Sequence, residues 1–128
     1  MFQKINDMFN IKKSKPLFFE HSAVPKILSI FAPITIGAIT IGPFVFSRDK
    51  MDVVTRRHET IHWQQYIELG IIGFPVLYFM YWLIGLVKYH DGAIAYVQIP
   101  FEQEAYDNDN DESYLLNRRR YNWIGFKI

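Results

Sequence analysis

Residues 53–69 read VVTRRHETIHWQQYIEL, and their spacing predicts an amphipathic helix. Residues that recur at three- and four-residue steps fall on one helical face, namely Val54, His58, Ile61, His62, Gln65 and Leu69. Asp52 comes directly before this stretch, and an aspartate there can accept a hydrogen bond from a free backbone N–H of the first turn. We therefore expect a helix that begins at Val53 and has Asp52 as its N-cap.

Two histidines on this helix, His58 and His62, flank Glu59 in the pattern His-Glu-x-x-His. Residues four apart lie one turn above each other, so both imidazoles can bind one metal ion, and the glutamate reaches the water-filled position beside it. The expected number of chance matches in a chain of this composition is about 0.006. The pattern predicts a zinc site with Glu59 as general base and then general acid. The alternative is a helix whose histidines serve only packing or solvation.

Such a zinc site normally has three protein ligands and an open fourth position. The chain contains no cysteine, so the third ligand must be a histidine or a carboxylate. The downstream candidates are His90, Asp91, Glu102 and Glu104. At this point all four stay open.

The composition indicates one richly apolar domain. Of the 128 residues, 50% are hydrophobic and 17% aromatic, which excludes a disordered tail and a protein that coats nucleic acid. The formal charge is only +1, but basic residues gather at both ends, where they suit solvent or anionic lipid. We expect a single domain over residues 1–128, with an N-terminal segment (1–26), a catalytic core (27–109) and a basic, aromatic tail (110–128). No ordinary signal peptide is expected.

Segments on either side of the motif helix have weaker patterns. The uncharged residues 27–46 contain β-branched residues and Gly and Pro breakers, which predicts a strand, a turn and a second strand. Residues 93–99 are typical of a strand. Pro100 can then open a short helix over residues 101–108.

Residues 69–87 carry no charge and, as one helix, would be about 28 Å long, close to the roughly 30 Å of a bilayer's hydrocarbon core. A straight membrane-spanning helix would leave Glu102 across the bilayer from the two histidines, because the chain cannot return through lipid as an unpaired strand. Residues 73–75 contain helix breakers. The metal site therefore predicts a helical hairpin that turns there, with a second arm over residues 76–89 running back toward the histidines.

This hairpin would offer more apolar and aromatic surface than so short a chain can easily cover. Its large aromatic residues are Phe74, Phe79, Tyr78, Tyr81 and Trp82. We therefore expect monotopic or re-entrant membrane association, on a side that the sequence leaves undefined. The alternative is a soluble protein with a buried central hairpin, helped by oligomerisation.

The chain resembles the gluzincin class of zinc metallopeptidases, particularly the membrane-linked branch in which a second helix carries Glu-x-x-Ala-Asp. The matching residues are Glu102-Gln103-Glu104-Ala105-Tyr106, and the resemblance covers about residues 36–109. It implies that Glu102 is the third Zn²⁺ ligand and that a peptide or protein substrate pairs with an edge strand over about residues 36–46. Tyr106 stands where the family has an aspartate that supports a metal-binding histidine.

The chain is also similar to a group of small bacterial and phage proteins. They share a His-Glu-x-x-His helix that continues into Gln-Gln, an aromatic apolar hairpin and a Phe-Glu-x-Glu-Ala-Tyr segment. The corresponding residues are His58–Gln65, Ile71–Leu86 and Phe101–Tyr106. This likeness supports the metal site without indicating a substrate.

Several other residues could support the site from outside the ligand set. They are Gln65, Glu104, Tyr106 and His90. Tyr96 and Tyr106 could also donate to the oxyanion formed during peptide hydrolysis. The run Arg118–Arg120 is interpreted as a solvated group of charges.

Together these patterns predict an α+β, zincin-like domain. Its elements would be an N-terminal β-hairpin, the motif helix, the apolar helical hairpin, a short strand and a glutamate-bearing helix. The predicted function is zinc-dependent peptide-bond hydrolysis, with His58, His62 and Glu102 as ligands and Glu59 as the proton carrier. No nucleic-acid partner is expected. The alternative is a non-enzymatic membrane or virion structural protein with a vestigial or structural metal site.

Overall fold

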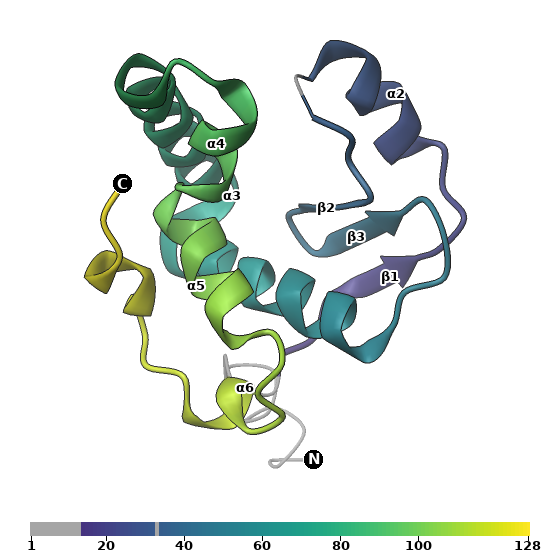
Figure 1. The fold of residues 1–128 in the computed structure, drawn as a ribbon. Helices are drawn as coiled ribbons and strands as arrows, with labels where there is room; N and C mark the ends of the chain where they lie inside the picture. Colours follow the sequence, from purple (N-terminus) through teal and green to yellow (C-terminus); the bar gives the residue numbers. More distant parts are fainter. Residues whose placement is uncertain (1–13, 33) are drawn as a thin grey trace, which may run out of the picture.

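A small sheet and a set of helices make up the described residues, 14–32 and 34–128, of this computed structural model (Figure 1). The fold class is α+β, as predicted. The strands are β1 (Leu17–Phe19), β2 (Ala38–Ile41) and β3 (Phe44–Ser47). The helices are α2 (Val24–Phe31), α3 (Val53–Tyr89), α4 (Gly92–Val97), α5 (Pro100–Asn108), α6 (Tyr114–Asn117) and the 3₁₀ helix η1 (Asn122–Gly125). The first half of the predicted N-terminal segment lies outside the described residues.

The predicted hairpin is present but shorter than expected. β2 and β3 pair antiparallel, and β1 pairs parallel to β3 on its other side, so the sheet order is β1-β3-β2 and β2 is an edge strand. The prediction of extended structure from residue 27 was wrong, because α2 occupies Val24–Phe31, with Pro25 in its first turn. Proline is favoured there, since the first N–H groups of a helix have no intrahelical partner.

Helix α3 begins as predicted but bends at a different residue. Asp52 is its N-cap, and the carboxylate accepts a hydrogen bond from Thr55 N at 2.7 Å. The helix is interrupted at Gly70, with φ 85° and ψ 166°, rather than at residues 73–75. Only glycine takes such a backbone conformation without strain. Pro75 lies inside the helix that follows, near its start. We call residues 53–69 the first arm and residues 71–89 the second arm.

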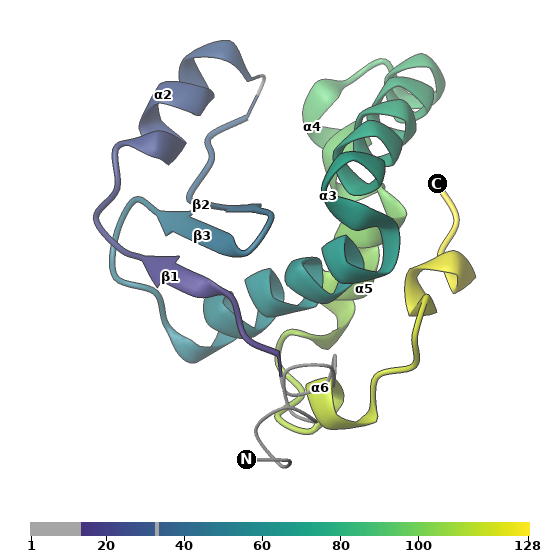
Figure 2. The same cartoon turned by 180° about the vertical axis from the view of Figure 1, so that it is seen from behind.

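The chain returns to the motif helix by a different route from the one predicted. The second arm leads away from the first arm, and α4 and α5 bring the chain back (Figures 1 and 2). The predicted strand over residues 93–99 is wrong, because α4 occupies Gly92–Val97. Asp91 caps that helix by accepting from the backbone N–H groups of Ala93 and Ile94. A helix satisfies its own backbone hydrogen bonds, whereas a strand here would need a partner strand.

An aromatic core joins the second arm, α5 and the C-terminal segment. Phe101 is fully buried and contacts Phe74 and Trp123, with ring centroids 4.7 and 4.8 Å apart. At Gly85 an added Cβ would lie 3.0 Å from Ala95 Cβ, so only a glycine lets α4 pack so closely on the second arm. Trp123, which sequence analysis placed in the basic, aromatic tail, is therefore part of the core.

The outer face of the second arm is apolar and exposed. Exposed apolar residues recur along it at three- and four-residue steps, among them Ile72, Val76, Met80, Leu83 and Val87. In α2, Ile30 and Phe31 are 76% and 83% exposed. Within the described residues, α3 is the one helix that is long and apolar enough to cross a membrane. By length and composition alone, this is weak support for membrane association.

Candidate metal centre

The first arm and α5 bring two imidazoles and one carboxylate together. His58 and His62 are buried and lie one turn apart on α3, and Glu102 is buried in the first turn of α5. His58 Nε2 lies 3.0 Å from Glu102 Oε2, and His62 Nε2 lies 3.0 Å from Glu102 Oε1. The two Nε2 atoms are 3.2 Å apart. This His-His-Glu group could hold a metal ion.

The distances within this group are close to those between the ligand atoms of a bound metal ion. Zinc–nitrogen and zinc–oxygen bonds of about 2.0–2.1 Å at tetrahedral angles place neighbouring ligand atoms about 3.3 Å apart. The two Nε2 atoms are 3.2 Å apart, and each lies 3.0 Å from a different oxygen of Glu102, so the contacts between the three side chains are close to that value. Two imidazole nitrogens with one carboxylate are also a ligand set that zinc uses in catalytic sites. The residues present could therefore hold a metal ion.

The electrostatics of the group also favour a cation. Burial alone would lower the pKa of His62, but the nearby carboxylates of Glu102 and Glu59 raise it to about 9. Burial would raise the pKa of Glu102, but the two imidazoles hold it well below its usual range. Positive charge between these side chains is thus strongly stabilised.

A carboxylate that the sequence analysis missed orients His58. The Nδ1 atom of His58 lies 3.1 Å from Asp109 Oδ2, at the C-terminal end of α5. A hydrogen bond from Nδ1–H to a carboxylate leaves Nε2 free to bind metal. Asp109 follows Glu102 by seven residues, which is two helical turns, so both acids lie on one face of α5. That spacing is the signal that could have found it.

Tyr106 occupies the position where the family resemblance implies an aspartate. Its ring packs edge-on against His58, with centroids 4.5 Å apart. Asp109 makes the hydrogen bond to His58 instead. His58 therefore still has a carboxylate partner, although Tyr106 stands in place of the aspartate that the family resemblance implies.

Glu59 points into the same region and is held by the edge strand. Its Oε2 atom accepts a hydrogen bond from the Thr40 hydroxyl at 2.6 Å. Thr40 lies in β2, and its backbone carbonyl accepts from the Tyr66 hydroxyl at 3.2 Å. Sequence analysis did not single out Thr40, because nothing local links it to a residue 19 positions away.

An open cleft of about 980 Å³ exposes this group to ligands. It is lined on one side by β2 and the end of α2, on its floor by the first arm, and on the other side by the second arm and α4. Figure 1 shows the same arrangement of elements. Residues of β2, Glu59 and the three candidate ligands all line the cleft.

The other predicted residues lie in three different places. Gln65 contacts His62 directly, with Oε1 2.8 Å from Nδ1. Glu104 is fully buried and faces Arg118, away from the two imidazoles. His90 caps the far end of α3 in a left-handed conformation and, like Asp91 beside it, is not part of the His-His-Glu group. Of the four downstream candidates, the structure brings only Glu102 to both histidines.

Tyr78 makes a further contact with Glu102. Tyr78, which the sequence analysis counted only among apolar surface residues, donates to Glu102 Oε1 at 2.9 Å. Burial raises its pKa well above the usual value, so the phenol stays protonated. Burial likewise raises the pKa of Tyr96, whose hydroxyl is hydrogen-bonded to that of Tyr106.

The chain matches no protein-family model, and no curated protein or solved structure shows significant similarity to it.

Proposed function

We propose that this chain is a zinc-dependent peptide-bond hydrolase. The observation that carries the proposal is the convergence of His58, His62 and Glu102 within a cleft that also contains Glu59. Bound zinc supplies a Lewis acid that polarises a carbonyl group and lowers the pKa of water. The ligand set leaves a fourth position for that chemistry, because only three protein ligands are present among the described residues.

Glu59 is the residue that moves protons. Because Oε2 accepts from Thr40, we assign proton transfer to Oε1. The carboxylate takes a proton from the attacking water while the water oxygen bonds to the peptide carbonyl carbon. When the C–N bond breaks, the same carboxyl group gives that proton to the leaving nitrogen. The products are a carboxylic acid and an amine, and Glu59 ends the cycle ionised as it began.

The edge strand β2 offers a means of holding an extended peptide. The sheet order leaves one side of β2 without a neighbouring strand, and its residues Ala38–Thr40 line the cleft. A peptide that pairs with β2 would pass beside Glu59, since Thr40 contacts that residue. Tyr96 and Tyr106 also line the cleft, and protonated phenols there could donate to a developing oxyanion.

The decisive test combines metal analysis with cleavage. The purified protein is expected to contain about one zinc per chain and to cleave members of a broad peptide library. Chelation should remove both the zinc and the cleavage, and added zinc should restore both. One zinc per chain with no cleavage of any library member would instead favour the non-enzymatic alternative with a structural metal.

We further propose that the protein works at a membrane surface. The second arm and α2 project to the same side of the molecule, and each carries exposed apolar residues (Figures 1 and 2). Exposed apolar patches of this kind mark protein or membrane contacts, and a bilayer can cover two separate elements at once.

Vesicle binding tests the membrane proposal. The double variant Ile72→Asp/Val87→Asp is expected to bind lipid vesicles at least about tenfold more weakly, because each aspartate in hydrocarbon costs about 2.5 kcal/mol or more. Both side chains are more than 70% exposed, so the fold should be kept. Leu116→Asp, which changes an apolar residue on α6 that is 65% exposed, is the matched control. Equal vesicle binding by the double variant and the control would rule out this surface.

A further inference from the structure

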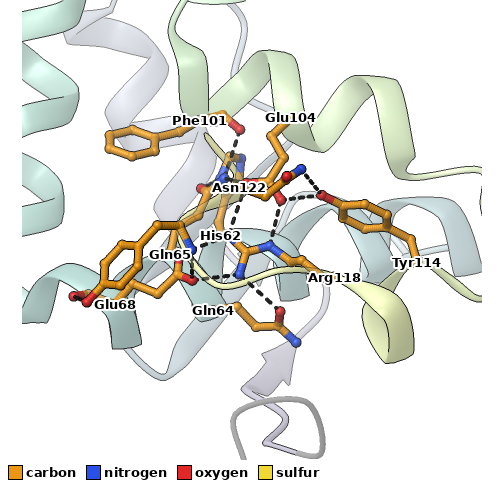
Figure 3. A network of polar contacts seen from close by, with 10 residues as sticks. His62, Gln64, Gln65, Glu68, Phe101, Glu104, Tyr114, Arg118 and Asn122 are labelled. Carbon is orange, nitrogen blue, oxygen red and sulfur yellow. Dashed lines mark hydrogen bonds and ion pairs between the residues drawn. The ribbon is translucent and has the colours of Figure 1, made fainter. Parts of the chain in front are cut away.

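A buried ion network lies beside His62 (Figure 3), and its charged residues Glu68, Glu104 and Arg118 do not line the cleft. At its centre is Arg118, whose side chain is 1% exposed, between Glu68 and Glu104, whose side chains are both 0% exposed. The guanidinium bonds to Glu104 through Nε at 2.5 Å and Nη2 at 3.0 Å. It bonds to Glu68 through Nη1 and Nη2, both at 2.9 Å. The prediction that residues 118–120 form a solvated run is therefore wrong for Arg118.

This network continues to one of the candidate metal ligands. Glu104 Oε1 accepts from Gln65 Nε2 at 3.0 Å, and the same Nε2 donates to the carbonyl of Phe101 at 3.1 Å. Because the amide nitrogen of Gln65 donates to both of these oxygens, it is the amide oxygen that faces His62. This oxygen lies 2.8 Å from His62 Nδ1. With a metal ion on Nε2, His62 would carry its remaining proton on Nδ1, where the oxygen of Gln65 accepts it.

We propose that Arg118 is a positioning residue for the metal centre, acting through Glu104 and Gln65 on the tautomer and orientation of His62. Two features support this role beyond simple packing. The guanidinium fork holds both oxygens of Glu104, which fixes the oxygen that anchors Gln65. Furthermore, α5 carries both Glu104 and Glu102, so Arg118 orients the helix that supplies the third ligand.

The proposal rests on the proposed metal site but not on catalysis. It makes the segment after α5, which the sequence analysis separated from the catalytic core as a tail, a part of the site. His58 has its own partner in Asp109, so the two imidazoles are oriented from different directions. Loss of Arg118 should therefore disturb His62 and spare the orientation of His58.

The test is a double-variant cycle on zinc affinity, measured by competition with a chelator. Arg118→Lys keeps the charge but loses the fork, and Gln65→Leu cuts the connection to His62. Each is expected to weaken zinc binding about 10- to 100-fold, as loss of such supporting hydrogen bonds commonly does. The double variant should be no weaker than Gln65→Leu alone, because both changes break one path. Arg119→Lys, at the exposed neighbouring position, is the matched control.

A second readout is the Nδ1 proton of His62 in the zinc-loaded protein. Nitrogen-15 NMR is expected to show slow exchange of this proton with water in the wild type, and faster exchange in Arg118→Lys and Gln65→Leu. Wild-type affinity and exchange in a folded Arg118→Lys protein, or additive losses in the cycle, would overturn the proposal. If Arg118→Lys fails to fold, Glu104→Gln takes its place, since Arg118 then still pairs with Glu68.

Zinc binding and peptide cleavage by the wild-type protein distinguish failure of this inference from failure of the proposed function. Zinc binding without peptide cleavage would remove the hydrolase proposal and leave the positioning role to be decided by the cycle. Absence of any zinc binding would overturn both.

Discussion

The Glu59→Gln variant is expected to lose peptide hydrolysis by about 10²- to 10⁴-fold while retaining about one zinc per chain. The amide has nearly the same shape as the carboxylate, so it can still accept from Thr40. It cannot take a proton from water at neutral pH, however, and therefore cannot activate the nucleophile. Glu59 is not among the candidate ligands, so the metal should remain. The measurement is cleavage rate beside zinc content on the same preparation.

Glu112→Gln is the control for this variant, because it makes the same change at an exposed position. A Glu59→Gln protein that binds zinc and cleaves at the wild-type rate would exclude Glu59 as the proton carrier. Thr40→Val should have a smaller effect of the same kind, because it frees the carboxylate without removing it.

The Glu102→Gln variant is expected to bind zinc more than about 100-fold more weakly than the wild type. Loss of a supporting hydrogen bond already costs 10- to 100-fold, and Glu102 is placed as a direct ligand. An uncharged amide is a much poorer zinc ligand than a carboxylate. Chelator competition measures the affinity. The increase in melting temperature that zinc produces in the wild type should also largely disappear.

Glu104→Gln is the matched variant for this measurement, because it makes the same change two residues later on α5. Its loss of zinc affinity is expected to be the smaller one, since Glu104 faces Arg118 and reaches His62 only through Gln65. The reverse order would identify Glu104 as the third ligand and would contradict the arrangement described above.

Local features of the fold followed well from the sequence. The N-cap at Asp52, the helix start at Val53 and the opening of α5 at Pro100 are as predicted. Each depends on interactions within about one helical turn, so neighbouring residues determine them. The β2–β3 hairpin was also expected, although its first strand begins only at Ala38.

The predictions of secondary structure were wrong where packing against distant segments decided the local conformation. A run that is typical of a strand, residues 93–99, became α4 because Asp91 caps a helix there and the second arm offers a helical surface to pack on. The bend in α3 lies at Gly70, where a glycine accommodates the positive φ, and Pro75 is accommodated near the start of the second arm. Neither the formation of α4 nor the position of the bend can be derived from the local propensities of the residues involved.

Within the candidate site, the sequence by itself determined the spacing of His58 and His62 and the position of Glu59 between them, because helical periodicity requires nothing beyond neighbouring residues. The family resemblance implied Glu102, and the tertiary structure brings it, rather than Glu104, to both histidines. Only the tertiary structure supplied Asp109 to His58 and buried Arg118 behind Gln65. Those choices depend on how α5 and the C-terminal segment pack against α3. Packing of this kind joins residues more than 40 positions apart, and no local pattern encodes it.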